Sequence, residues 1–208
     1  MGVIGIAGQL STGKDSVADY IVSKLGWKKI PLAKHVKRIY CETFGVDLEF
    51  VEKWKRIDDP PPGFDMNVRK SLQFIGDGFR KIKGSIWIEL LFQNAVESFA
   101  LSDCRYINEI RKVKELKGLM VLMYRPDFEN DDPNDSEAQI KPLVDWFKST
   151  GREGYVTGEL VKECPEALVD APIGVSYIDL FLINDGTLED LHKKIDKFIL
   201  SDSKYKTT

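Results

Sequence analysis

The residues with the clearest chemistry lie near the N-terminus, in the stretch GQLSTGKDS at positions 8–16. Gly8, Gly13 and Lys14 match a phosphate-binding loop, in which a glycine is followed by four residues, Gly-Lys, and then Ser or Thr. Such a turn directs several backbone N–H groups at one anion, and the lysine adds a positive charge near the β- and γ-phosphates. The loop residues predicted to hold a nucleotide are Gly8, Ser11, Thr12, Gly13, Lys14, Asp15 and Ser16.

One position departs from that pattern, because Asp15 stands where the hydroxyl that normally holds Mg²⁺ is expected, and Ser16 follows it. A carboxylate is a hard oxygen ligand for Mg²⁺, directly or through water, and the Ser16 hydroxyl is the alternative. A carboxylate beside a triphosphate is repelled unless a cation lies between them. Two arrangements therefore stay open: Asp15 or Ser16 supports the metal, or Asp15 points away from the phosphates.

The segments around the loop predict the context that the motif requires. Residues 3–7 are apolar and indicate a buried parallel strand, and residues 14–25 have helical spacing that ends at Gly26. Further strands are predicted at residues 27–33, 105–108, 119–124 and 178–184. Further helices are predicted at residues 36–44, 68–79, 86–100 and 113–117, with a last one after Thr187 as N-cap and Asp190 three residues on. The alternation favours an α/β fold with a parallel sheet covered on both faces.

Two stretches interrupt this alternation. Three consecutive prolines in residues 58–65 predict an exposed loop, because proline fixes φ and lacks an N–H donor. Residues 125–139 are acidic and rich in turn formers, which indicates a mobile loop or lid. Most of residues 140–175 give no clear pattern.

Composition excludes several classes of protein. The chain has 208 residues and a formal net charge of -3, so it suits one α/β domain without a uniformly basic nucleic-acid surface. Its three cysteines show no zinc spacing or disulfide framework, and its two histidines argue against a histidine-built metal site. No apolar run is long enough to cross a bilayer, and the N-terminus does not resemble a signal peptide, so we expect a cytoplasmic protein.

The stretch TGKDSVADYI resembles the bacteriophage deoxynucleoside monophosphate kinases, a family of P-loop nucleotide kinases whose loop also carries Gly-Lys-Asp, a hydroxyl residue and an Ala-Asp pair. Four further stretches are similar in the same order: LAKHVKRI, RKSLQFIGDGFRK with IWIELL, RYINEIRKVKE, and LFLINDGTLEDL. The resemblance covers most of the chain except about residues 127–177. It implies a three-layer P-loop kinase fold with a central parallel sheet of about five strands. It also implies an acceptor-binding region at about 34–100 and a lid insertion at about 125–177.

The resemblance also implies roles for single residues. Lys37, Arg69 and Gln73 are expected to bind the acceptor. In the family, one strand ends in an acidic residue, one spacer and an arginine. Glu109 and Arg111 match this pattern, with glutamate in place of the family's aspartate. Asn184 and Gly186 are expected near the donor adenine. The predicted catalytic residues are Lys14, Glu109, Arg111 and Arg125, and the predicted metal ligands are Asp15, Ser16 and Glu109.

Together these features predict an ATP- and Mg²⁺-dependent phosphotransferase that acts on a deoxynucleoside monophosphate, a small-molecule partner. An alternative keeps the donor site and phosphorylates the hydroxymethyl group of a modified base, 5-hydroxymethyluracil, in DNA; the basic clusters KHVKR and FRKIK would then contact the backbone. A third reading is a nucleotide-binding module without turnover. The sequence leaves the base preference and a possible homodimer open.

Overall fold

The computed structural model describes residues 2–93, 97–126, 135–150, 153–155 and 171–201. The chain divides into two compact units. The sheet unit comprises residues 1–31 and 96–208, and the helical unit comprises residues 32–95. The acceptor-binding region expected at 34–100 nearly coincides with the helical unit, although its role stays a prediction.

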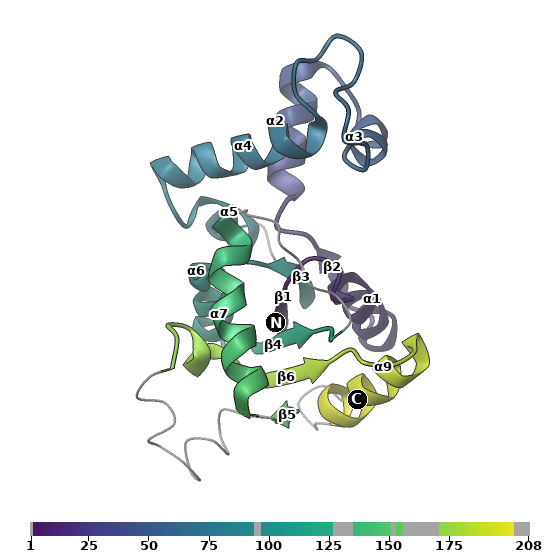
Figure 1. The fold of residues 1–208 in the computed structure, drawn as a ribbon, viewed down its shortest axis with the longest axis vertical. Coiled ribbons are helices and arrows are strands. Elements are labelled where there is room, and N and C mark those ends of the chain that lie inside the picture. The colour runs from purple at the N-terminus through teal and green to yellow at the C-terminus, as the bar shows by residue number, and fades with distance from the viewer. Residues whose placement is uncertain (1, 94–96, 127–134, 151–152, 156–170, 202–208) are drawn as a thin grey trace. The chain divides into compact units, whose positions relative to one another are not determined.

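The sheet unit is built on a sheet of order β2-β3-β1-β4-β6-β5 (Figure 1). Its strands are β1 (Val3–Gly8), β2 (Lys28–Ile30), β3 (Phe99–Cys104), β4 (Leu119–Tyr124), β5 (Gly154–Tyr155) and β6 (Leu180–Ile183). All neighbouring pairs are parallel except β5 with β6. Every residue of the central strand β1 is buried, as expected for a parallel strand covered on both faces. The predicted parallel sheet of about five strands is confirmed.

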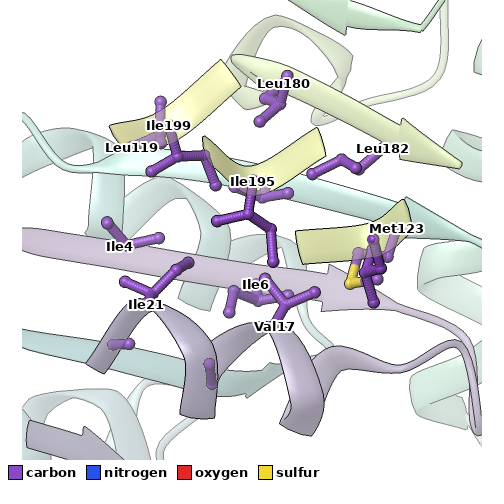
Figure 2. Close-up of a cluster of buried hydrophobic side chains, with 14 of the residues drawn as sticks. Ile4, Ile6, Val17, Ile21, Leu119, Met123, Leu180, Leu182, Ile195 and Ile199 are labelled. Carbon is purple, nitrogen blue, oxygen red and sulfur yellow. The ribbon is translucent and has the colours of Figure 1, made fainter. Parts of the chain in front are cut away.

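Helices cover both faces of this sheet (Figure 1). On one face, α1 (Lys14–Leu25) and α9 (Leu188–Ile195) share an apolar cluster with β1, β4 and β6, in which Val17, Ile21 and Ile195 meet Ile4 and Ile6 (Figure 2). On the other face, α6 (Ile107–Glu115) and α7 (Asp135–Thr150) contact β1 and β4. A 3₁₀ turn at Val175–Tyr177 and a π-helical end at Asp196–Leu200 complete the described elements. The predicted three-layer fold, with a central parallel sheet between two helix layers, is therefore confirmed.

Helix α7 lies inside the stretch that the sequence assigned to a lid. Its residues Ile140, Leu143, Val144 and Phe147 are all almost fully buried, and the helix contacts β1 and β4. Residues 135–150 are therefore a layer of the fold. Three parts of the predicted lid, at 127–134, 151–152 and 156–170, lie outside the described residues.

Two sequence predictions around β3 were wrong. The helix predicted at 86–100 is shorter, as α5 (Ile86–Gln93), and Phe99–Cys104 forms β3. The strand predicted at 105–108 is also wrong, because α6 begins at Ile107. A short apolar run satisfies helix and strand patterns alike, and the pairing of β3 with both β1 and β2 decides for the strand.

The helical unit contains α2 (Lys34–Phe44), α3 (Leu48–Trp54), α4 (Val68–Ile82) and α5. Its apolar cluster centres on the buried side chains of Tyr40, Val51 and Val68. Asp47 and Asn67 cap α3 and α4 by accepting hydrogen bonds from backbone N–H groups. Residues 58–65 connect α3 to α4 without helix or strand, so the loop predicted from the three prolines is confirmed.

Among the described residues, the longest apolar helical stretches fall short of what a bilayer crossing requires. The cytoplasmic location and the homodimer stay predictions.

Candidate active site

The loop between β1 and α1 has a backbone conformation that requires glycine at two positions, Gly8 and Gly13. Gly8 has φ 151°, Ser11 has φ 59° and Gly13 has φ 97°. A Cβ atom on Gly8 would lie 2.7 Å from the backbone oxygen of Met123, and one on Gly13 would lie 2.8 Å from Asn184 Nδ2. Glycine is therefore required at both ends of the loop by conformation and by space. The predicted motif glycines are the residues that shape the turn.

Side-chain hydrogen bonds hold this turn in place. The Thr12 hydroxyl, on a residue only 2% exposed, donates to the backbone oxygen of Gln9 at 2.9 Å. Asn184 Nδ2, from the residue after β6, donates to the backbone oxygen of Thr12 at 3.0 Å. The loop is thus fixed from within and from a distant strand. Gly186 is exposed in the turn that precedes the α9 cap, and its predicted place near the adenine stays a prediction.

Lys14 is the first residue of α1 and is only 6% exposed. Its Nζ donates hydrogen bonds to the backbone oxygens of Gly8, at 2.8 Å, and of Gln9. The ammonium group therefore lies over the loop instead of extending into solvent. A cation folded over a glycine turn, at the amino end of a twelve-residue helix, fits a polyphosphate chain.

Asp15 pairs with a lysine from another strand. Its Oδ1 lies 2.8 Å from Nζ of Lys29 in β2, and the same Nζ lies 3.0 Å from Oδ1 of Asp19. Partial burial acts to raise the pKa of Asp15, but hydrogen bonds from the Lys29 and Ser102 side chains outweigh it and hold that pKa below its ordinary value. The neighbouring Ser16 is exposed. Of the two arrangements that the sequence left open, this geometry favours an Asp15 that is turned toward β2.

Glu109 and Arg111 both lie on α6 and not at a strand end. Glu109 is 2% exposed, and its Oε2 accepts hydrogen bonds from the backbone N–H groups of Arg105, at 2.8 Å, and Tyr106, at 3.1 Å. This carboxylate therefore caps the start of the helix. The Arg111 side chain is 58% exposed, with its Nε 3.9 Å from Glu115. The catalytic roles expected for both residues stay predictions.

The strand end itself carries Asp103 and Arg105, which the sequence analysis missed. Arg105 Nε lies 2.6 Å from Asp103 Oδ1, and both side chains are about one quarter exposed. In the parallel β1–β3 pair Ala7 is opposite Cys104, so these residues flank the beginning of the loop. They have the spacing of an acidic residue, one spacer and an arginine, and here the acid is aspartate. Asp103 and Arg105 are thus a second candidate pair beside the predicted Glu109 and Arg111.

Arg125 follows β4 directly and is exposed. Gly8 is paired with Met123 in the parallel β1–β4 ladder, so Arg125 lies two residues beyond the partner of the first loop glycine. The carboxyl ends of β3, β1 and β4 therefore place Asp103, Arg105, the loop and Arg125 along one edge of the sheet, where ligands of open α/β sheets bind. The role of Arg125 in catalysis stays a prediction.

The predicted acceptor residues lie in the helical unit. Lys37 Nζ hydrogen-bonds to Glu52 at 2.5 Å, and Lys55 also pairs with Glu52. Partial burial acts to raise the pKa of Glu52, yet the two lysines hold it below its ordinary value. Arg69 is exposed in the first turn of α4, and the half-buried Gln73 lies one turn later on the same face. Lys37 is thus engaged inside the unit, whereas Arg69 and Gln73 share a helix face.

A metal site built from protein groups alone is not seen: within the described ranges, no three His, Cys, Asp or Glu residues gather closely enough to hold an ion. Magnesium in nucleotide sites commonly takes one or two protein carboxylates together with substrate phosphates. Asp103 fits that requirement by its place at the strand end, and it joins the predicted ligands Asp15, Ser16 and Glu109 as a candidate.

Comparison with known proteins adds a relative and several solved structures. No family model matches the chain. A protein of Acanthamoeba polyphaga mimivirus named "Putative deoxynucleotide monophosphate kinase" is 26% identical over 162 residues, which are 69% of this chain and 84% of that protein. The chain itself shows a mainly parallel α/β sheet with a glycine loop of the phosphate-binding type between β1 and α1.

Solved structures of kinases are similar at lower identity. Dephospho-CoA kinase from Campylobacter jejuni is 16% identical, with 97% of each chain covered and a TM-score of 0.44. Shikimate kinase from Acinetobacter baumannii is 17% identical, with 98% of this chain and 95% of that chain covered and a TM-score of 0.44.

Proposed function

We propose that the protein is an ATP-dependent nucleotide kinase, which transfers the γ-phosphoryl group of ATP to the 5′-phosphate of a deoxynucleoside monophosphate. The observation that carries this proposal is the shaped loop, with the Lys14 ammonium folded over it and Asp103, Arg105 and Arg125 along the same edge of the sheet. The name of the mimivirus relative supports the deoxynucleotide acceptor.

On the donor side, the backbone N–H groups of the loop and the start of α1 would bind the β- and γ-phosphates. Lys14 would exchange its hydrogen bonds to Gly8 and Gln9 for bonds to phosphate oxygens. Asn184 acts indirectly, because it holds the backbone oxygen of Thr12 and so fixes the loop. This work is positional, which is the main demand of phosphoryl transfer.

In the transfer itself, an oxygen of the acceptor phosphate attacks the γ-phosphorus, and the bond from that phosphorus to the β–γ bridging oxygen breaks as ADP leaves. A phosphate monoester has a second pKa of about 6, so the attacking oxygen is already ionised at neutral pH. The reaction therefore needs no general base, and the capping contacts of Glu109 are consistent with a supporting role.

Charge neutralisation is the remaining requirement, because both reacting groups are anions. Arg105, Arg125 and Arg111 are the candidate cations of the sheet unit, and arginine can bind phosphate through two parallel hydrogen bonds. Asp103, Asp15 or Ser16 would hold a bound Mg²⁺, which would supply positive charge beside the β- and γ-phosphates. Arg69, Gln73 and Lys37 are proposed to bind the acceptor.

A coupled assay of ADP release with a panel of deoxynucleoside monophosphates tests the proposal. We expect turnover with at least one of them, and its loss in Lys14→Ala but not in Lys24→Ala, an exposed lysine in the last turn of the same helix. ATP binding without turnover on any monophosphate would overturn the proposal. Radiolabelled ATP with hydroxymethyluracil-containing DNA serves as a second arm, since label on polymer alone would also contradict it.

A further inference from the structure

Lys29 is the only residue of the described chain for which an ion pair with Asp15 is seen, and it comes from an edge strand of the sheet. Its Nζ lies between two carboxylates, 2.8 Å from Asp15 and 3.0 Å from Asp19. Those two aspartates are four residues apart on α1, so they share the helix face that contacts β2 and β3. The Lys29 side chain is only 26% exposed, whereas that of Asp15 is 79% exposed.

The ion pair with Asp15 is particular to Lys29, because Lys28 in the same strand has a different partner. Side chains alternate between the two faces of a strand, and the Lys28 side chain is 68% exposed and pairs with Glu97 instead. Ser102 of the neighbouring strand β3, only 2% exposed, contributes to the lowered pKa of Asp15. The contact that fixes the Asp15 carboxylate on the β2 side of the helix is the ion pair with Lys29.

This arrangement bears directly on ATP. Asp15 follows the loop lysine, at the position where nucleotide loops normally have an uncharged hydroxyl. A free carboxylate there would repel the triphosphate and would oppose the positive end of the helix dipole. A lysine bound to that carboxylate removes most of the repulsion and keeps the group on the β2 side of the helix.

We infer that Lys29 is a positioning residue for the donor nucleotide: it holds the Asp15 carboxylate against β2 and cancels its charge, which lets this loop accept a triphosphate with aspartate in the hydroxyl position. The inference rests on the proposed function only in taking ATP as the ligand of the loop. It predicts that Lys29 acts through Asp15, without touching the nucleotide.

Binding of ATP by calorimetry in excess EDTA, without acceptor, tests this without any turnover. We expect Lys29→Met to weaken ATP binding about fivefold, because one uncompensated carboxylate near the phosphates costs on the order of 1 kcal/mol. Asp15→Asn and the Lys29→Met/Asp15→Asn double variant should bind ATP with the same affinity as each other, and both should bind it more tightly than Lys29→Met. Lys28→Met, the matched control from the same strand, should leave the affinity unchanged.

The double variant separates a charge effect from a purely structural one. If Lys29 merely fastened β2 to α1, the double variant would bind ATP as weakly as Lys29→Met, and that result would overturn the inference. An unchanged affinity in Lys29→Met would overturn it as well. Thermal unfolding of each variant, measured alongside, identifies a loss of affinity that comes from a damaged fold.

Magnesium gives a second readout. A carboxylate released from Lys29 becomes available to a divalent cation, so saturating Mg²⁺ should restore most of the ATP affinity that Lys29→Met loses in EDTA. A deficit of the same size with and without Mg²⁺ would contradict the charge argument. Failure of the proposed function is distinguishable, because ATP would then bind with this pattern while no monophosphate is phosphorylated.

Discussion

The phosphate loop of the sheet unit and the predicted acceptor residues of the helical unit are built in opposite ways. The loop is shaped by backbone: two glycines without room for a Cβ, a threonine bonded to its own turn, and an asparagine from a distant strand. The predicted acceptor residues are side chains on the faces of helices, and one of them, Lys37, forms a hydrogen bond with Glu52. A donor site can therefore be recognised from local spacing, whereas an acceptor site depends on how long side chains are arranged.

This contrast explains why the donor loop gives a more specific sequence motif than the predicted acceptor region. A turn defined by φ angles and by close approach tolerates few sequences, so its motif is specific. An exposed arginine on a helix, such as Arg69, is common on protein surfaces of many kinds, so it gives little information about function. The variants below test whether the two regions differ in this way, in order of decreasing expected effect.

The largest effect should come from the loop lysine. Lys14→Ala removes the cation that lies over the turn, and we expect turnover to fall by at least about 10²–10³-fold, the loss that follows removal of one preorganised charge-stabilising group. Steady-state kinetics measure it, with Lys24→Ala as control. A Lys14→Ala enzyme within threefold of the original would show that the loop does not act on phosphate.

The strand end offers a direct choice between two arginines. Arg105→Ala should lower kcat about 10²-fold, because Arg105 lies at the carboxyl end of β3 beside the loop. Arg111→Ala should change kcat much less, because that side chain is exposed on α6. Equal losses would mean that α6 contributes to the site as the sequence first suggested, and a larger loss in Arg111→Ala would reverse the assignment.

A substitution in the helical unit should change the KM for the monophosphate. Arg69→Ala is expected to raise the KM for the monophosphate about tenfold or more, the scale of one lost charged hydrogen bond, and to leave the KM for ATP unchanged. Lys70→Ala, the exposed neighbour on α4, is the matched control. A rise in the KM for ATP instead would remove Arg69 from the acceptor site.

The smallest effect concerns stability. Glu109→Gln weakens the buried cap that accepts two backbone N–H bonds, so the free energy of unfolding should fall by about 1–2 kcal/mol. Thermal and urea unfolding measure this, with Glu115→Gln on the exposed side of α6 as control. Once folded, the variant should keep most of its kcat. A loss of activity without a loss of stability would make Glu109 part of the chemistry.

Much of the fold was predictable because its signals are local. The apolar run of β1, the glycine turn and the spacing of α1 each stand in consecutive residues, and so do β4, β6 and the Thr187–Asp190 cap of α9. The capping box is confirmed with both of its hydrogen bonds. These segments decide their own conformation, so no knowledge of their partners is needed.

The features that the sequence analysis missed depend on contacts between residues far apart in the chain. Strand β3 follows an apolar helix closely in sequence, and only its pairing with β1 and β2 distinguishes it from a continuation of that helix. Because the strand was expected at 105–108, Asp103 and Arg105 at the end of β3 were not considered as a candidate pair. The Lys29 pairing was likewise invisible, because nothing in the short strand KKI indicates which of its lysines faces Asp15.

The bond from Asn184 to Thr12 connects residues 172 positions apart. The ribosome synthesises the loop before β6, so the loop lacks this hydrogen bond until β6 and Asn184 have been made. A nascent chain without β6 should therefore contain the complete loop sequence but not the hydrogen bond that supports Thr12. Nucleotide binding would then arise only after β6 has been synthesised and has joined the sheet beside β4.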